Sequence, residues 1–211
     1  MKKTVLVLTA LVLSGTMGIT GLAWAQVQLQ QFKPSVKIVF VTSQRYTGNL
    51  GGLAGANAKC QQLATAAGLT GTYKAWLADN NSMPTTAFTH STSPYVLVNG
   101  TRIADDWTSL ITKPLLHELF TDERNTVVFY NKGYGPEVWT GIYLYHPSGS
   151  MSIGFDYYYQ SCRGWNSANE EDSGVAGLNY WTMALPPFTT AWSSYERVPC
   201  NQNLHLYCFQ Q

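Results

Sequence analysis

Charge is scarce in this sequence. Only 12% of its 211 residues are charged, with 13 lysines and arginines against 12 aspartates and glutamates. The arginines stand singly, at Arg45, Arg102, Arg124, Arg163 and Arg197. Nucleic acids and heparin-like polyanions bind clustered basic side chains. The sequence therefore predicts no polyanion-binding surface and no nucleic-acid partner.

The motifs of common catalytic sites are also missing. The HEL segment at 117–119 begins like a zinc-protease motif, but Thr121 stands where the second histidine belongs. The glycine-rich segment 48–55 matches no phosphate-binding pattern, and no GxSxG nucleophile motif occurs. The histidines lie far apart, at His90, His117, His146 and His205. We predict a protein that is not an enzyme; a hydrolase using two facing carboxylates is the alternative.

Long apolar runs are confined to the first residues. Lys2 and Lys3 precede an apolar stretch that ends near Leu22, and Ala23-Trp24-Ala25 then gives the small-x-small pattern of a cleavage site. We predict a signal peptide over residues 1–25, cleaved between Ala25 and Gln26. A membrane anchor is the alternative, but the interrupted run falls short of the ~20 apolar residues of a span. The protein is therefore expected in the periplasm, on the cell surface or outside the cell.

The mature chain should form one domain. Removal of 25 of the 211 residues leaves 186, enough for one well-buried core. It also removes two of the 13 basic residues and none of the 12 acidic ones, which leaves 11 against 12 and a formal charge of −1. We expect a lead-in over 26–35, a single domain over 36–211, and no membrane span in the mature chain.

Cysteine is scarce too, with four residues at Cys60, Cys162, Cys200 and Cys208. An even count in an exported chain favours two disulfides over a metal site. The closest pair is eight residues apart, which is wider than the usual Cys-x2–4-Cys spacing of zinc ligands. Four cysteines allow three pairings, and spacing alone leaves all three open.

Hydrophobic periodicity predicts a mixed α+β domain. Residues 36–42 are typical of a buried strand, and 72–79 of a strand covered on both faces. The segment "LAGANAKCQQLATAAGL" predicts a helix that buries Cys60, Leu63, Ala64 and Ala67 and stops at Gly68.

Shorter elements are expected along the rest of the chain. Asn99-Gly100 predicts a two-residue hairpin turn within 95–104, and Asp105 or Asp106 should cap a following helix. Strands are expected over 126–130, 138–141 and 204–208, and a loop over 80–93.

Tyrosine is concentrated between residues 143 and 159. The candidate ligand-binding residues are Tyr143, Tyr145, Tyr157, Tyr158 and Tyr159. Tyrosine offers a broad contact surface with a polar tip, which suits proteins and sugar rings. Three consecutive tyrosines in a strand cannot all face inward. The alternative, that these rings pack the second half of the domain, stays open.

Several separate motifs occur in order between Val36 and Gln211: "GGLAGANAKCQQLATAAGLTGTYKAWLAD", "PYVLVNGTRIADDWTSL", "VWTG", "CRGW" and the terminal "LYCFQQ". Together they resemble endostatin, the C-terminal domain of certain collagens. The chain is also similar to endostatin-like surface proteins of spirochaetes and other bacteria. The resemblance implies a variant of the C-type-lectin-like fold with nested Cys60–Cys208 and Cys162–Cys200 disulfides.

The metal and heparin sites associated with these folds have no counterpart in the motifs. Calcium-dependent lectins use an EPN or QPD triplet and a WND triplet, whereas this chain has only "WNS" at 165–167 and "AWSSYERVPC" before Cys200. The acidic run Glu170, Glu171 and Asp172 is the one calcium candidate, and a solvated loop is the favoured interpretation. The lead-in lacks the histidine of the endostatin zinc site. We therefore expect no cofactor.

The combined prediction is an exported, non-catalytic binding or adhesion module. Its partner would be an extracellular protein or a glycan, bound without calcium through the tyrosine-rich segment. The alternative is a structural subunit of a surface layer or filament, in which the same aromatic surface would support self-association. A calcium-dependent lectin and an unrecognised hydrolase are the remaining alternatives.

Overall fold

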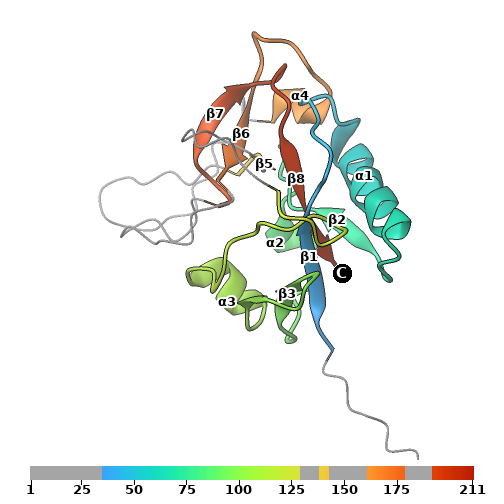
Figure 1. Cartoon of the computed structure of the whole chain (residues 1–211). Coiled ribbons are helices and arrows are strands. Elements are labelled where there is room, and N and C mark those ends of the chain that lie inside the picture. The colour runs from blue at the N-terminus through green and yellow to red at the C-terminus, as the bar shows by residue number, and fades with distance from the viewer. Residues whose placement is uncertain (1–34, 129–137, 143–160, 179–191) are drawn as a thin grey trace, which may run out of the picture. The chain divides into compact units, whose positions relative to one another are not determined.

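The last strand of the chain, β8 (His205–Gln210), lies near the centre of an eight-stranded sheet (Figure 1). The computed structural model describes residues 35–128, 138–142, 161–178 and 192–211. The strand order is β4-β3-β1-β8-β5-β6-β7, and β2 pairs with β8 beside this path. The other strands are β1 (Lys37–Val41), β2 (Tyr73–Ala75), β3 (Tyr95–Leu97), β4 (Arg102–Ala104), β5 (Val138–Trp139), β6 (Ser173–Gly177) and β7 (Glu196–Pro199).

Both edges of β8 carry hydrogen-bonded partners. Strand β1 runs antiparallel along one edge, with Phe40 opposite Cys208. On the other edge β5 runs parallel to the first residues of β8, with Val138 opposite His205, and β2 runs antiparallel to the last, with Ala75 opposite Cys208. A strand that is paired on both edges leaves no open ladder. The end of the chain is thereby held against fraying.

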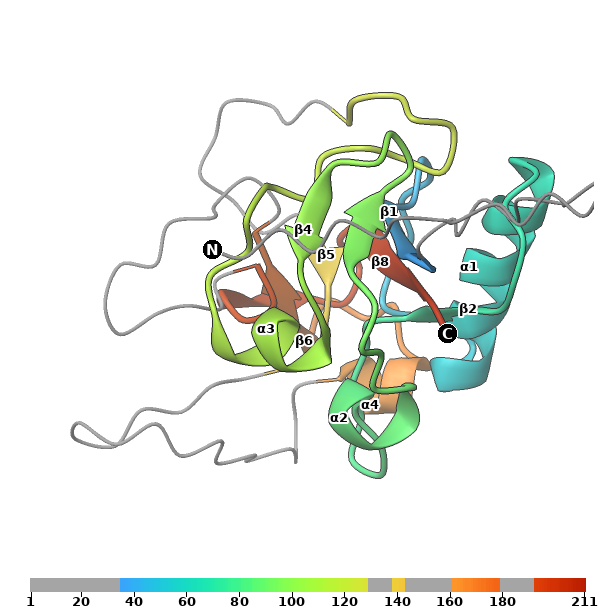
Figure 2. The ribbon, with the colours of Figure 1, turned by 90° about the horizontal axis from the view of Figure 1, so that it is seen from below.

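Both faces of β8 enter apolar cores, because successive residues point to opposite sides of a sheet. Leu206 and Cys208 lie in the core that α1 (Gly52–Ala66) covers. Tyr207 and Phe209 lie in a second core with Trp76 and the buried residues of α3 (Trp107–Thr112). Figure 2 shows α1 and α3 on opposite sides of β8. The two remaining helices are α2 (Pro84–Ala87) and α4 (Cys162–Trp165).

Helix α1 confirms the periodicity that the sequence predicted. Cys60, Leu63 and Ala64 are buried, whereas Ala67 is only partly buried because it is already the C-cap residue. Gly68 follows with a φ of 74°, the left-handed conformation that commonly ends helices. The cap of α3 is Asp106, which accepts a hydrogen bond from the backbone N–H of Ser109 at 2.6 Å.

The hairpin of β3 and β4 forms, but with a different turn from the predicted two-residue turn. A type I′ turn needs positive φ at both central residues, and of Asn99 and Gly100 only the glycine has it, at 86°. The N–H of Gly100 donates to the carbonyl of Leu97, and the N–H of Leu97 donates to the carbonyl of Thr101, both at 2.8 Å. The turn is therefore a three-residue loop with Gly100 in its bulge position.

Four other expectations were wrong in part. Of the strand expected over 138–141, only Val138–Trp139 forms β5. Residues 80–93 contain the short helix α2, with Pro84 at its first position, where a loop was expected. The strand expected over 72–79 covers only Tyr73–Ala75: the N–H of Trp76 still bonds to Tyr207 of β8, but that of Ala78 bonds to Thr140 instead. Within the described part of 126–130, Val127 makes only an isolated bridge, and residues 129–130 lie outside the description.

Two nested disulfides close the domain. Cys60 of α1 is bonded to Cys208 of β8, with their Cα atoms 5.5 Å apart. Cys162 is bonded to Cys200, with a Cα–Cα distance of 5.7 Å. These are the pairs that the resemblance implied. Their sequence separations of 148 and 38 residues correspond to about 5 and about 4 kcal/mol of chain-entropy stabilisation, as upper figures.

Loss of the outer disulfide should destabilise the protein more than loss of the inner one. In a Cys60→Ala/Cys208→Ala double variant, we expect the free energy of unfolding to fall by about 2–5 kcal/mol. The reason is that the unfolded chain gains conformational entropy when its largest closed loop is opened. Urea denaturation followed by tryptophan fluorescence measures this loss against Cys162→Ala/Cys200→Ala. Non-reducing peptide mapping of the wild type is the control, and a Cys60–Cys162 linkage would contradict the fold.

Candidate functional site

The residues that the sequence singled out are only partly described. Tyr143, Tyr145, Tyr157, Tyr158 and Tyr159 lie outside the described residues, as do Ala25 and Gln26 at the predicted cleavage site. The acidic run Glu170–Asp172 is described. Among the described helices, none has the length and apolar character needed to cross a membrane.

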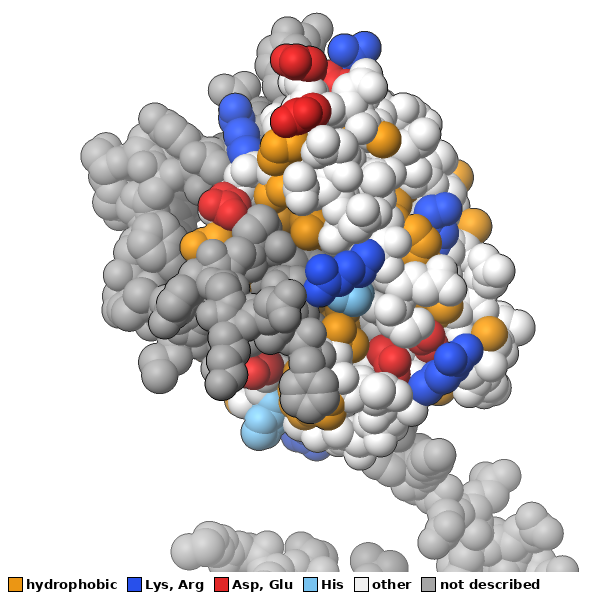
Figure 3. Space-filling model, turned by 45° about the horizontal axis from the view of Figure 1, so that its top comes forward, with side chains coloured by type: hydrophobic (Ala, Val, Ile, Leu, Met, Phe, Trp, Pro, Cys, Tyr) orange, Lys and Arg blue, Asp and Glu red, His pale blue; other side chains and the backbone are white. Residues whose placement is uncertain are grey.

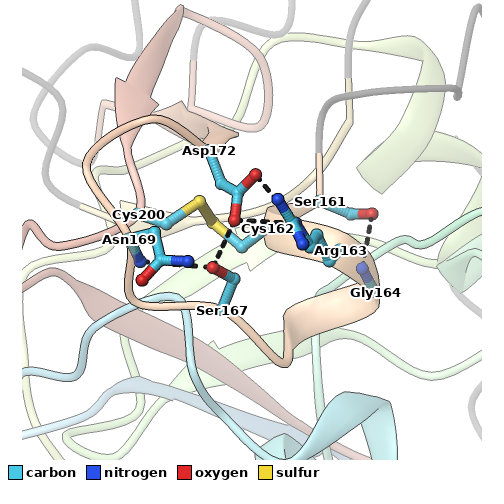
Figure 4. Close-up of polar contacts among 8 residues, drawn as sticks. All are labelled: Ser161, Cys162, Arg163, Gly164, Ser167, Asn169, Asp172 and Cys200. Carbon is cyan, nitrogen blue, oxygen red and sulfur yellow. Dashed lines mark hydrogen bonds and ion pairs between the residues drawn. A yellow bond between two sulfur atoms is a disulfide. The ribbon is translucent and has the colours of Figure 1, made fainter.

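Asp172 is the centre of a group of polar residues beside the inner disulfide (Figure 4). We call this group, formed by Arg163, Ser167, Asn169 and Asp172, the polar knot. The Asp172 carboxylate accepts a hydrogen bond from Arg163 Nε at 2.9 Å and another from the hydroxyl of Ser167. The hydroxyl of Ser167 also accepts from the backbone N–H of Asn169 at 3.2 Å. The carbonyl of Asp172 accepts from the N–H of Cys200 at 2.9 Å. The polar knot thus fastens residues 163–172 to the disulfide.

The contacts of Asp172 give the calcium interpretation no support. The hydrogen bond from Ser167 and the Arg163 guanidinium hold the pKa of the Asp172 carboxyl below its usual range. A calcium ion at this carboxylate would have to displace the guanidinium. Glu170 and Glu171 are exposed, and no group of three potential metal ligands of the His, Cys, Asp or Glu type occurs among the described residues.

The turn that carries Arg163 is left-handed. Cys162, Arg163, Gly164 and Trp165 all have positive φ, between 46° and 66°. Such a conformation costs roughly 1–2 kcal/mol for each non-glycine residue. Burial of Trp165 offsets this cost, since its indole N–H donates to the carbonyl of Ala78 at 2.8 Å. The turn leaves the Arg163 side chain 71% exposed beside Asp172.

Two glycines make room for the inner disulfide. A Cβ atom on Gly48 would lie 2.3 Å from the Cys162 sulfur, and one on Gly174 would lie 2.8 Å from it. The loop after β1 and the strand β6 therefore both approach the sulfur more closely than any side chain would allow. This packing fixes the start of the polar knot against the sheet.

Both ends of the tyrosine-rich segment are attached to β6. On the N-terminal side, the N–H of Gly141 donates to the carbonyl of Val175 at 2.9 Å. On the C-terminal side, Ser161 forms a bridge with Gly174 and precedes the disulfide-bonded Cys162. The chain thus leaves and returns at adjacent residues of one strand. Ile142 and Ser161, which flank the segment, are buried.

A second group of polar residues surrounds the start of β8. The N–H of Thr42 donates to the carbonyl of Leu206 at 2.9 Å, and Tyr46 exchanges two backbone hydrogen bonds with Leu204. Residues 42–46, which we call the arch, therefore cross over the intervening residue, His205. The arginine of the arch, Arg45, donates from Nε to His205 Nε2 at 2.9 Å.

A buried carboxylate also holds the arch. Glu123 is only 1% exposed and accepts hydrogen bonds from both the N–H and the hydroxyl of Ser43. Burial, with the nearby Glu123 charge, raises the pKa of Tyr46. On the face drawn in Figure 3, acidic and basic side chains are interspersed rather than gathered by sign.

Sequence reasoning missed the residues of the arch. His205 interrupts the apolar run of a buried strand, and that interruption was the one available signal. Nothing in the sequence pairs Ser43 with Glu123, 80 positions away, or Arg45 with His205, 160 positions away.

The fold and these groups can be compared with known families. A family model described as "Protein of unknown function (DUF1554)" matches residues 43–182, more than half of the 211-residue chain. The chain belongs to the DUF1554 family. No curated protein matches it.

The folded unit of this DUF1554 member extends past the matched residues. Each disulfide joins a cysteine inside the match, Cys60 or Cys162, to one beyond it, Cys208 or Cys200. Strands β7 and β8 also follow the match. Since β8 pairs with β1, β2 and β5, the described residues 192–211 belong to the same fold as the matched part of the chain.

Asp172 should stabilise this DUF1554 protein in a pH-dependent way. We expect Asp172→Asn to lower the urea midpoint at neutral pH, because the hydrogen bonds from Arg163 and Ser167 favour the charged carboxylate. Since the folded-state pKa is lowered, the contribution is fully present above the unfolded value of about 3.9 and is lost as the pH falls through the folded pKa. The deficit of the variant should therefore vanish in acid.

Glu171→Gln is the matched control for this prediction, because Glu171 is exposed and lies next to Asp172 in the chain. It should leave the urea midpoint at its wild-type value at every pH. Equal midpoints for Asp172→Asn and Glu171→Gln at neutral pH would show that the polar knot contributes nothing. A calcium-dependent rise in the wild-type midpoint would contradict the structural assignment of Asp172.

Proposed function

We propose that this protein is an exported, non-catalytic binding module with an endostatin-like variant of the C-type-lectin-like fold. The nested disulfides support the fold proposal, because they join α1 to the last strand and the two middle cysteines to each other. Membership of a family of unknown function leaves the activity itself as a proposal.

The observation that carries the binding proposal is the attachment of the tyrosine-rich segment. Its flanking residues bond to Val175 and Gly174 of β6, and the disulfide-bonded Cys162 follows directly. Segments carried between fixed points on a rigid scaffold are where binding residues concentrate. The segment contributes Tyr143, Tyr145, Tyr157, Tyr158 and Tyr159.

The proposed ligand is an extracellular protein or a glycan, bound without calcium. Tyrosine rings provide apolar contact area and a hydroxyl for hydrogen bonding, so they serve both ligand classes. Calcium independence is favoured because the carboxylate of Asp172 is already paired with Arg163. The mature charge of −1 argues against a polyanionic glycan.

Binding to an array of glycans and matrix proteins tests this proposal. We expect the chain from Gln26 to Gln211 to give a signal that chelator does not change, and we expect serine at all three positions Tyr157–Tyr159 to abolish it. Tyr195→Ser is the matched control, because Tyr195 is an exposed tyrosine outside the segment. It should bind like the wild type.

Other outcomes of the same experiment count against the proposal. A glycan signal lost in chelator would indicate a calcium-dependent lectin and would point to Glu170–Asp172. Silence on the whole array, with concentration-dependent assembly in size-exclusion chromatography, would indicate a structural subunit of a surface layer or filament.

Export has its own test. A signal peptidase that recognises Ala23-Trp24-Ala25 leaves Gln26 as the first residue of the mature protein. Expression of the full chain in a bacterium and mass spectrometry of the exported fraction should find this N-terminus. An intact N-terminus in a membrane fraction would indicate the anchor instead.

A further inference from the structure

The hydrogen bonds of His205 define one protonation state. Its Nε2 receives the N–H of Arg45, and a guanidinium can only donate, so Nε2 carries no proton. Its Nδ1 lies 2.6 Å from the carbonyl of Thr42, which can only accept, so Nδ1 carries the single proton. The imidazole is therefore neutral, and both of its nitrogens are bonded to the arch.

Protonation would destroy one of these two bonds. An imidazolium has an N–H on each nitrogen, so Nε2 would turn a proton toward the guanidinium of Arg45. The donor–acceptor pair would become two donors of like charge in contact. The ring is only 3% exposed, so little water is available to separate the two charges.

We propose that His205 is a proton-operated latch, which holds the arch over the start of β8 at neutral pH and releases it in mildly acidic surroundings. The moving part is the arch, residues 42–46, and the trigger is the proton on Nε2. Histidine is suited to this role because its ordinary titration range lies just below neutrality. The proposal is independent of any ligand of the tyrosine-rich segment.

Burial, hydrogen bonds and nearby charges together determine the pH at which His205 takes up the proton. Burial is the largest influence and lowers the pKa of His205, and the positive charge of Arg45 in the arch lowers it further. The hydrogen bonds to the backbone of Thr42 and Gln44 and the negative charge of Glu123, from the turn after α3, act in the opposite direction. The net result is a pKa of His205 below its ordinary value.

The sign of the resulting stability change follows from linkage. Because the folded-state pKa is lowered, the unfolded chain binds a proton more readily than the folded protein does. The contribution of neutral His205 is complete above its unfolded pKa of about 6.5 and is lost as the pH falls through the folded pKa. Acid therefore favours states in which the arch is open.

The backbone contacts of the arch limit how far it can open. Without the latch, the bonds of Ser43 to Glu123 and of Thr42 and Tyr46 to Leu206 and Leu204 open more often, but they still re-form and keep the arch near β8. On its other edge, β8 stays paired with Val138. Release of the latch should therefore loosen the arch alone, without unfolding the sheet.

NMR titration of His205 in four forms of the protein tests the charge assignment. In the wild type we expect the pKa of His205 below the ordinary value of about 6.5. Arg45→Gln should raise this pKa, since it removes a positive charge, and Glu123→Gln should lower it, since it removes a negative one. Arg102→Gln, an exposed arginine paired with Asp105, is the matched control and should leave it unchanged.

Amide hydrogen exchange tests the release itself. Between about pH 7.5 and pH 5, the N–H groups of Ser43 and Tyr46 should gain about tenfold in exchange rate beyond the intrinsic pH effect. The N–H of Trp76, bonded to Tyr207 on the other edge of β8, should gain nothing. His205→Gln should abolish the gain, because an amide accepts from Arg45 but takes up no proton.

Three results would overturn the proposal. They are a wild-type pKa of His205 at or above the ordinary value, a pKa that Arg45→Gln does not raise, and equal exchange at the arch and at Trp76. If His205→Gln or Glu123→Gln fails to fold, the wild-type titration and the exposed Arg45→Gln variant still decide the matter.

Discussion

Everything in this fold depends on the pairing of the last strand. Strand β8 is hydrogen-bonded to β1 on one edge and to β5 and β2 on the other. Its side chains enter both apolar cores, and Cys208 is covalently joined to Cys60 of the first helix. The residues that arrive last in the chain therefore complete the sheet, both cores and the outer disulfide at once. Without them, β1, β2 and β5 would expose unpaired edges.

The inner disulfide has a different role, because it organises the loops rather than the sheet. Cys162 begins a left-handed turn whose backbone is unfavourable on its own, and Trp165 anchors that turn by filling the core. Gly48 and Gly174 allow the loop after β1 and strand β6 to approach the sulfur. One small region thus fixes the polar knot and one end of the tyrosine-rich segment.

Local signals in the sequence predicted local structure well. The phase of Cys60 in α1, the stop at Gly68 and the cap at Asp106 each depend on residues within one or two turns. The turn at Asn99-Gly100 was mispredicted because Asn99 does not adopt the positive φ that the favoured two-residue turn requires. The disulfide pairs came only from the resemblance. The bonds of Glu123 to Ser43 and of Arg45 to His205 are long-range, so no periodicity could reveal them.

The placement of His205 has a structural consequence of its own. Regular pairing between β1 and β8 runs from Val39 to Val41. The segments on either side of His205 pair again at Tyr46 and Leu204. Between these points the arch replaces a strand, and the ring of His205 is bonded to Arg45 and to the backbone of the arch. A buried apolar residue at this position would need no such partners and would hold the sheet equally well at every pH. The sheet keeps its hold on β8 through Val138, whichever state the imidazole is in. A histidine here thus adds sensitivity to protons at a point where β8 is also held by its pairing with β5.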